Sequence, residues 1–316
     1  MNGNSRIIFL QEILKETIWG GNRLSEYGFD TNGKNCGEAW VISAHKNGDC
    51  LIKDSGNGKS TLSWFWKEHP EFFGKSEAET ENNPFPLLTK IIDAKSDLSI
   101  QVHPDDGYAK KNENGSLGKT ECWYILDALP GTKIVIGHNG KSPEETAKMI
   151  RQGLWKDFIR EIPVKKGDFF YIKPGTVHAI KGGTLILETQ QSSDITYRVY
   201  DYDRLSNGKP RELHVQQSID VIASPFIEEE PPRNEAKSVD KEFSQLVSCD
   251  KFTVWKAAVK GRLDFVQNQD FLLCTVVEGE GEINGTKIKK GDSFILGKNF
   301  GEAEFKGQME LILSSE

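Results

Sequence analysis

Two short stretches of the sequence place potential metal ligands near the ends of predicted β-strands. In LSIQVHPDD, the alternation of side chains along a strand puts Ser99, Gln101 and His103 on one face. In TECWYIL, the same alternation makes Glu121 the first residue of a face that then becomes apolar. Imidazole nitrogens and carboxylate or amide oxygens are common metal ligands. These residues therefore predict part of a metal site.

A third stretch, KPGTVHAI, adds a second histidine. Pro174 and Gly175 predict a tight turn that presents His178 at the start of another strand. Together with Glu121 and Gln101, the two histidines suit zinc or a similar divalent ion, with room for water or substrate. The other histidines are interpreted as packing or surface residues; they are His45, His69, His138 and His214.

The stretch around His178 has an unequal copy near the end of the chain. VKKGDFFYIKPGTVHAI (164–180) and IKKGDSFILGKNFGEAEF (288–305) share Lys-Lys-Gly-Asp and a Phe-containing apolar run. The first copy, with Pro-Gly-x-x-His after this strand, is a cupin-like pattern. No histidine occurs after His214. We therefore expect one metal per chain, in the N-terminal part, and none in the C-terminal copy.

Charged residues follow in LILETQQSSDITYRVYDYDR. Alternation places Glu188 on one face of its strand, and it places Asp194, Arg198 and Arg204 in phase along the next. Two arginines near a metal would suit a phosphorylated substrate, because guanidinium groups pair well with phosphate oxygens. The alternative is a cross-strand ladder of ion pairs on an exposed face.

The elements that must position these residues are mostly short strands separated by Gly, Asn and Asp, which predicts a mainly β chain of the sandwich or jelly-roll type. Helical insertions are expected at 60–74, at 141–159 with Ser142 as N-cap, and at 211–223. The charged, proline-bearing stretch EEEPPRNEAKSVDKE predicts a linker. We therefore expect a catalytic domain at 1–240 and a smaller β domain at 241–316.

Composition narrows the class of protein. A chain of 316 residues favours about two domains, and a formal charge of −7 disfavours nucleic acids and anionic membranes as partners. No apolar run is long enough for a membrane span and no signal-like segment opens the sequence, so we expect a soluble, cytoplasmic protein. The five scattered cysteines include no Cys-x-x-Cys, which predicts reduced, structural thiols.

These motifs make the chain similar to the type I mannose-6-phosphate isomerase family in its short bacterial form. The resemblance covers nearly the whole chain, through TIWGG (17–21), GEAW (37–40), LSIQVHPDD (98–106), GKTECWYIL (118–126), PGTVHA (174–179), ETQQSSDITYR (188–198) and RELH (211–214). It implies a zinc-dependent isomerase with a cupin fold, formed by a jelly roll with helical insertions and a smaller C-terminal cupin-like domain. The implied substrate is a sugar phosphate, with mannose 6-phosphate and fructose 6-phosphate interconverted.

The resemblance also implies roles for individual residues. His103, Glu121 and His178 match zinc ligands of the family, and Gln101 matches a fourth ligand that some members use. Further matched positions are the active-site Arg198, the pocket residues Ser99, Lys119 and Glu188, the N-terminal Trp19, and Arg204 where longer members have a lysine. The chain lacks the larger helical insertion of those longer members.

Isomerisation between C1 and C2 passes through an enediol, so the site must stabilise an oxyanion and move a proton. Zinc would supply the first function as a Lewis acid. Glu188 is the leading base, with Lys119 and Arg198 as electrostatic partners of the intermediate. Ser99 and Arg204 would bind the phosphate, and Trp19 is counted with the substrate pocket.

Two other functions fit parts of the pattern. His103, Glu121 and His178 could also form the facial triad of a non-haem iron oxygenase, which oxygen-independent turnover with zinc would exclude. A non-catalytic sugar-binding cupin is the other alternative. The presence of Glu188, Lys119 and Arg198 beside the metal residues argues against it, because a pure binder needs no proton-transfer groups.

Overall fold

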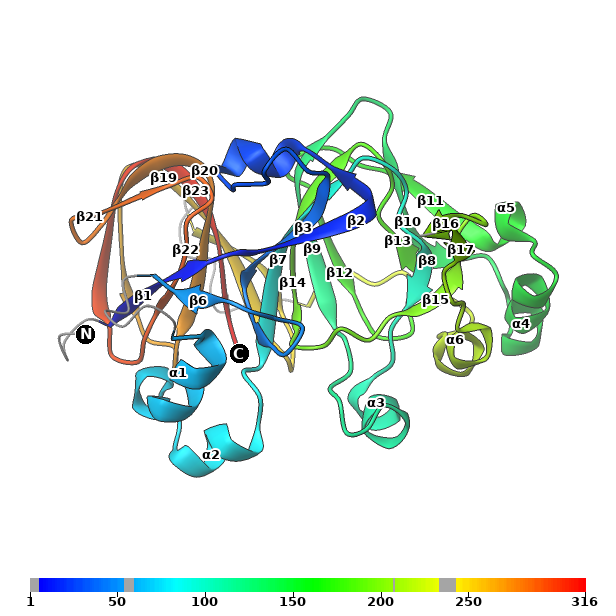
Figure 1. The fold of residues 1–316 in the computed structure, drawn as a ribbon, viewed down its shortest axis with the longest axis horizontal. Helices are drawn as coiled ribbons and strands as arrows, with labels where there is room; N and C mark the ends of the chain where they lie inside the picture. The colour runs from blue at the N-terminus through cyan, green and yellow to red at the C-terminus, as the bar shows by residue number, and fades with distance from the viewer. Residues whose placement is uncertain (1–5, 54–59, 207, 233–242) are drawn as a thin grey trace.

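The computed structural model describes residues 6–53, 60–206, 208–232 and 243–316. Strands dominate these residues, and three large sheets lie one behind another along the long axis of the molecule (Figure 1). The mainly β class predicted from the sequence is confirmed.

The central sheet has six strands, in the order β12 (Phe169–Ile172), β9 (Glu121–Ala128), β14 (Thr184–Gln191), β7 (Leu87–Ala94), β2 (Ile13–Gly21) and β3 (Cys36–Ile42). The outer sheet has five, in the order β11 (Ile159–Pro163), β10 (Lys133–His138), β13 (His178–Ala179), β8 (Ile100–Val102) and β15 (Tyr197–Tyr200). Two small hairpins pair β4 (Ala44–His45) with β5 (Gly48–Asp49) and β16 (Leu205–Ser206) with β17 (Lys209–Pro210).

The C-terminal sheet lies on the other side of the central sheet (Figure 1). Its order is β18 (Phe243–Ser248), β19 (Thr253–Gln267), β23 (Gly301–Ser315), β20 (Leu272–Ile283), β22 (Ser293–Leu296), β1 (Ile7–Gln11) and β6 (Leu51–Ile52), with β21 (Thr286–Lys289) beside β20. The first described strand thus completes a sheet made mostly by the last part of the chain.

Short helices lie at both ends of this stack. One insertion between β6 and β7 forms α1 (Leu62–Glu68), η2 (Pro70–Phe73) and α2 (Glu77–Asn82), and η1 (Arg23–Tyr27) follows β2. The remaining helices are α3 (Asp106–Asn112), α4 (Pro143–Arg151), α5 (Trp155–Phe158) and α6 (Val215–Val221). The predicted helical insertions are confirmed, including Ser142 as N-cap of α4, whereas α2 and α3 were not predicted.

Alternation along the central strands separates two environments. In β14, Leu185 and Leu187 pack toward the C-terminal sheet, whereas Ile186 packs into an apolar cluster with residues of the outer sheet. In β9, Trp123 and Ile125 join that second cluster. The same alternation points Glu121 and Glu188 into the space between the central and outer sheets, and Glu121 shares its face with Trp123 and Ile125, as predicted.

The outer sheet is covered on its far side by helices. Ile100 and Val102 of β8 pack there with Phe158 of α5 and with the partly buried Ile219 of α6. Because neighbouring residues point to opposite faces, Ser99, Gln101 and His103 must face the central sheet. These polar residues therefore point into the space between the two sheets, next to the apolar cluster that Trp123 and Ile125 join.

The repeated Lys-Lys-Gly-Asp stretches form matching turns. In the first, Asp168 Oδ2 accepts a hydrogen bond from Lys165 N at 2.9 Å. In the second, Asp292 Oδ2 accepts one from Lys289 N at 2.9 Å. Each turn leads into a four-residue strand, β12 or β22, so the sequence repeat reflects a structural repeat.

The division into domains at about residue 240 remains a proposal. The boundary itself and most of the predicted linker, 233–242, lie outside the described residues. The pairing of β1 with β22 carries the N-terminal segment across the proposed boundary. An aromatic group also spans it, since Phe271 makes ring contacts with Phe73 and Phe85.

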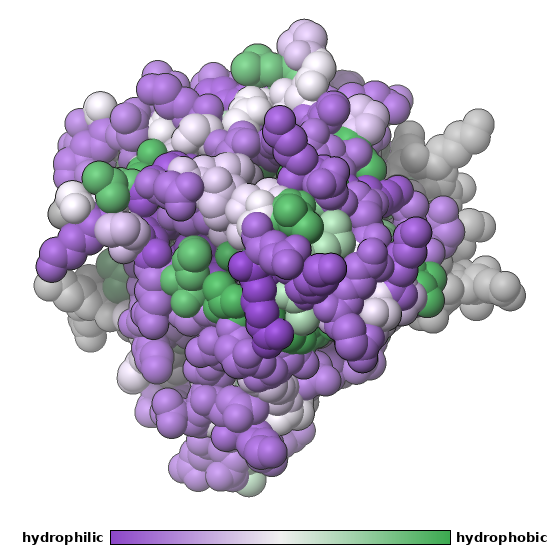
Figure 2. All heavy atoms as spheres, turned by 90° about the vertical axis from the view of Figure 1, so that its right-hand side faces the viewer, coloured by the Kyte–Doolittle hydropathy of each residue, from purple (hydrophilic) through white to green (hydrophobic). Residues whose placement is uncertain are grey.

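The surface beyond the outer sheet is mainly hydrophilic, with hydrophobic residues only in small separate groups (Figure 2). Nowhere in the described ranges is a helix both long and apolar enough to cross a membrane. All five cysteines are free thiols, and four of them are buried.

Candidate metal centre

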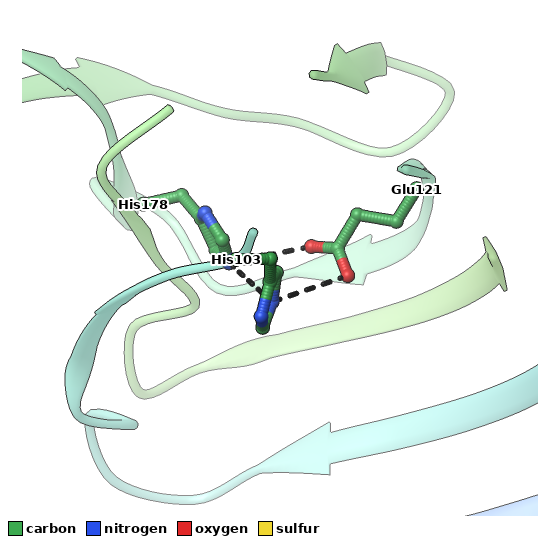
Figure 3. A group of neighbouring side chains, drawn as sticks. All are labelled: His103, Glu121 and His178. Atoms are coloured by element: carbon green, nitrogen blue, oxygen red, sulfur yellow. Dashed lines mark hydrogen bonds and ion pairs between the residues drawn. The ribbon is translucent and has the colours of Figure 1, made fainter. Parts of the chain in front are cut away.

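Three predicted ligands converge between the central and outer sheets. His103 follows the end of β8, Glu121 begins β9 and His178 begins β13. One ligand atom from each lies within 4.8 Å of the others, and all three side chains are buried. Figure 3 shows the two imidazoles and the carboxylate pointing at a common centre.

The turn before His178 has the predicted form. Thr176 N donates to Lys173 O at 3.1 Å, and Gly175 has φ +83°, which suits the third position of a type II turn. Gly175 N also donates to His103 O at 2.9 Å. This hydrogen bond joins the two segments that carry the histidines.

Both histidine rings are oriented by backbone carbonyls. His103 Nδ1 lies 2.8 Å from Ile195 O, and His178 Nδ1 lies 2.9 Å from Thr176 O. A carbonyl can only accept, so each Nδ1 carries the proton and each Nε2 is unprotonated, with a lone pair that can bind a metal. Metal-binding histidines in proteins are commonly oriented in this way.

The separations of the ligand atoms fit one shared ion. The two Nε2 atoms are 3.1 Å apart, and they lie 3.3 and 3.6 Å from the nearer Glu121 oxygens. A tetrahedral ion with ligands at about 2.0–2.1 Å has edges of roughly 3.3 Å. Glu121 Oε1 is buried and has no hydrogen-bond partner, which a coordinated cation would satisfy. The donor set therefore fits a divalent metal.

Burial sets the protonation of these groups. It lowers the pKa of His178 to about 4 and that of His103 well below its usual range, where Lys119 adds to the effect. Both rings are therefore neutral and able to ligate. Burial, together with the nearby Glu188, raises the pKa of Glu121, although Lys119 opposes this shift. A bound cation would favour the ionised carboxylate.

Lys119 and Glu188 lie directly beside this group. Lys119 Nζ is 3.2 Å from His103 Nε2 and contacts Glu121 Oε2, and it lies 3.7 Å from Glu188 Oε1. Trp123 Nε1 donates to Glu188 Oε1 at 3.1 Å. Burial raises the pKa of Glu188, but Lys119 and Lys90 outweigh it and lower the pKa to about 2. The Glu188 carboxylate is therefore ionised.

Two charged residues of this site, Lys90 and Glu38, were not predicted from the sequence. Lys90 Nζ lies 3.5 Å from Glu188 Oε2 and 3.7 Å from Glu38 Oε2. It is 5% exposed, on a strand whose eight residues are all buried. Carboxylates and ammonium groups thus alternate in space along the row of neighbouring side chains that leads from Glu121 to Glu38. The detectable signal was a lysine inside the apolar run LLTKIIDA.

Gln101 lies on β8 between the two segments that complete the site. It is opposite His178 of β13 and opposite Arg198 of β15. Alternation turns its side chain toward the central sheet, as it does that of the buried Ser99. Coordination of the metal by Gln101 and substrate binding by Ser99 remain proposals.

Arg198 is half-enclosed next to Gln101. Its Nη1 donates to Glu212 O at 2.8 Å, whereas its buried Nε has no hydrogen-bond partner. His214 Nδ1 accepts from Arg198 N at 3.2 Å, and His214 N donates to Arg198 O at 2.8 Å. His214 therefore fixes the backbone of Arg198, a contact that the sequence did not indicate.

The position predicted for Arg204 is wrong. Strand β15 ends at Tyr200, and Tyr202 has φ +56°, so Arg204 lies in a turn rather than in phase with Arg198. Arg204 Nη2 pairs with Asp201 Oδ1 at 2.5 Å. Strand alternation continued through YDYDR could not anticipate this reversal.

The alternative of a cross-strand ion-pair ladder is also excluded within the described residues. Asp194 Oδ2 accepts a hydrogen bond from Asn47 Nδ2 at 2.9 Å, and Glu188 forms ion pairs with lysines rather than with arginines. Asp201 is instead shared by Arg204 and by Arg211, whose Nε donates at 2.7 Å. Arg211, from the RELH motif, is a further residue that sequence analysis did not single out.

Trp19 is buried, 5% exposed, in the apolar cluster between the central and outer sheets. Its carbonyl oxygen accepts from Lys95 N at 3.0 Å and Ser96 N at 3.2 Å. Trp19 therefore supports the segment that leads to Ser99. A direct contact of its ring with substrate remains a proposal.

Two known protein families match parts of this chain. The signature of the phosphomannose isomerase type I catalytic domain matches residues 7–125, and that of the mannose-6-phosphate isomerase cupin domain matches residues 242–316. The cupin match confirms the predicted fold class.

Similar whole proteins were found as well. A mannose-6-phosphate isomerase of Bacillus subtilis is 45% identical over 312 residues, covering 97% of this chain and 98% of the relative. One of Streptococcus mutans is 45% identical over 317 residues, covering 97% of each. A crystal structure of the mannose 6-phosphate isomerase from Bacillus subtilis superposes with a TM-score of 0.91 at 42% identity, covering 98% of this chain and 99% of that one.

Proposed function

The chain belongs to the type I phosphomannose isomerase family, and we propose that it interconverts mannose 6-phosphate and fructose 6-phosphate at one zinc ion. The observation that carries the proposal is the inward-facing group of His103, Glu121 and His178, with Lys119 and Glu188 directly beside it. The relatives that match almost the full chain are named for this activity.

The metal would be bound by the two Nε2 atoms and the Glu121 carboxylate, with Gln101 as a fourth ligand. Zinc fits the nitrogen and oxygen donors and their spacing of 3.1–3.6 Å. When bound, it would supply Lewis-acid polarisation of the substrate's C1 or C2 oxygen.

The side chains around this group suit proton transfer through an enediol. Glu188 would accept the proton from C2 of mannose 6-phosphate, which bears a hydroxyl group next to the C1 carbonyl. It would return this proton to C1 once the hydroxyl proton has moved from O2 to O1. Lys119, 3.7 Å from Glu188 Oε1, would stabilise negative charge on the substrate oxygens. Burial of both side chains excludes water, which strengthens these interactions.

The phosphate would bind among the arginines at the edge of the outer sheet. The positive charges of Arg198 and Arg211 are close enough to repel each other. The Asp201 carboxylate partly neutralises the charges of all three arginines, Arg198, Arg204 and Arg211. The three guanidinium groups outnumber the carboxylates of Asp201 and Glu212, which leaves a net positive charge that would attract a phosphate dianion. Ser99 would add a hydroxyl group that binds the phosphate, and Trp19 would form part of the wall of the substrate pocket.

The two alternative functions lose support. The full-length relatives are named as isomerases, not oxygenases or binding proteins. We also propose a cytoplasmic location, because sugar-phosphate metabolism takes place there; the number of subunits is left open.

The metal content should be about one zinc per chain. The N-terminal part offers the His103, Glu121 and His178 group, whereas the repeat at 288–305 contains no histidine or cysteine. Elemental analysis of the purified protein measures this number. A double variant, His103→Ala with His178→Ala, should hold almost none, and a metal that persists there would contradict the assignment.

Replacing Arg198 with lysine should lower kcat/KM roughly ten- to a hundredfold without unfolding the protein. A lysine keeps the charge, but it cannot reproduce a planar guanidinium that engages two oxygens, a loss of about 1.5–3 kcal/mol. Steady-state kinetics on mannose 6-phosphate provide the measurement. Lys209→Arg, the reverse exchange at an exposed position, is the control. Unchanged kinetics in Arg198→Lys would remove Arg198 from the site.

A further inference from the structure

The loop that leads into Glu121 is fastened to the segment that follows His103. Gly118 N donates to Asp106 Oδ1 at 2.8 Å, and Lys119 N donates to Pro104 O at 3.0 Å. A Cβ on Gly118 would lie 2.4 Å from the carbonyl carbon of Asp105, so the two backbones are in direct contact. The positions of two ligand-bearing segments therefore depend on one another.

Asp106 holds this loop on both sides of Lys119. Its Oδ1 also accepts from Gln191 Nε2 at 2.9 Å. Gln191 Oε1 in turn accepts from Thr120 N at 2.9 Å, and Gln191 N donates to Thr120 O at 3.0 Å. One carboxylate thus connects the segment after His103, the approach to Glu121 and the end of β14, which carries Glu188.

The remaining partner of Asp106 comes from the C-terminal sheet. Lys251 lies between β18 and β19, and its Nζ is 2.9 Å from Asp106 Oδ2. The two side chains are 30% and 39% exposed, and they line a cavity of about 620 Å3. Lys251 therefore reaches from the C-terminal sheet to the carboxylate that connects the ligand-bearing segments.

We infer that Asp106 and Lys251 are positioning residues of the metal centre, through which the C-terminal part helps to build a site it does not contain. The inference rests on the proposed function, because it requires a metal at His103, Glu121 and His178. Ligand positions matter to within about 0.5 Å, and partners that orient metal ligands typically change affinity 10- to 100-fold. This would give the C-terminal part a role in building the metal site although its sequence contains no histidine.

The test is the zinc affinity of the full-length protein without substrate, measured by competition with a chromophoric chelator. Asp106→Ala removes every contact of the carboxylate and should weaken zinc binding about 10- to 100-fold. Asp106→Asn keeps an acceptor for Gly118 N and Gln191 Nε2, so only the tie to Lys251 is lost. Asp106→Asn and Lys251→Met should therefore weaken zinc binding by the same factor, about two- to fivefold.

Lys256→Met is the matched control. Lys256 also spans the junction, since its Nζ donates to Tyr124 OH at 2.7 Å, and its side chain is 28% exposed, close to the 30% of Lys251. Tyr124 points away from the metal group, toward the C-terminal sheet. This variant should keep the zinc affinity of the unaltered protein, even if its melting temperature falls.

A purely structural role would lower the melting temperature of all these variants without separating their zinc affinities. The inference would be overturned if Lys251→Met and Asp106→Asn bound zinc as tightly as Lys256→Met does. This criterion does not depend on Asp106→Ala, so it still applies if that variant fails to fold. The proposed function would stand in that case. If the unaltered protein binds no zinc, the proposed function fails and the inference falls with it.

Discussion

Replacing His178 with alanine should abolish measurable isomerisation and release the metal. The ring is fully buried, and its Nε2 lies 3.1 Å from that of His103 and 3.3 Å from Glu121 Oε1, so no other side chain can take its place. Loss of Lewis-acid stabilisation is worth several kcal/mol, which corresponds to a fall in kcat/KM of roughly a thousandfold or more. Kinetics and elemental analysis on the same sample measure both effects.

The control for this variant is His69→Ala. The His69 side chain is 42% exposed and lies near Glu71, far along the chain from the ligand segments. The His69→Ala variant should retain its metal and its rate of turnover. If His178→Ala also retained both, His178 would not be a ligand.

Glu188→Gln should lower kcat by about 10²- to 10⁴-fold, the usual contribution of a general base. The amide keeps the size of the side chain and an oxygen that can accept from Trp123 Nε1, but it cannot take up a proton. Metal content should not change, because Glu188 is not among the three ligands. The variant therefore separates proton transfer from metal binding.

Exchange of hydrogen with solvent gives a second measurement for Glu188→Gln. Proton transfer through an enediol should incorporate deuterium at C2 of mannose 6-phosphate during turnover in deuterium oxide. In the variant, this exchange should slow in parallel with isomerisation. Normal exchange and normal kcat would show that another group moves the proton, with Lys119 as the nearest candidate.

The elements that carry the metal ligands were predictable because local rules determine them. Alternation within a strand decides the faces of Gln101 and Glu121, and a Pro-Gly turn places His178 at a strand start. The repeated Lys-Lys-Gly-Asp turns depend on a hydrogen bond between residues three apart, as in Lys165 and Asp168. Such short-range features can be read from sequence directly.

Other features depend on contacts between distant parts of the chain. Lys90 lies in an apolar strand, and only the register of β7 against β14 places it opposite Glu188. The pairing of β1 with the C-terminal sheet has no local signal either. Arg204 was misplaced because the chain reverses at Tyr202 and Asp203, two non-glycine residues with positive φ. Patterns of alternation carry no information about such reversals.

The most direct test of the central claim is a coupled assay of the purified protein with mannose 6-phosphate, before and after removal of metal by a chelator. The zinc-loaded protein should form fructose 6-phosphate without a need for oxygen, the chelated protein should form almost none, and added zinc should restore the rate. Absence of conversion by the zinc-loaded protein, or full activity after complete removal of metal, would contradict the account.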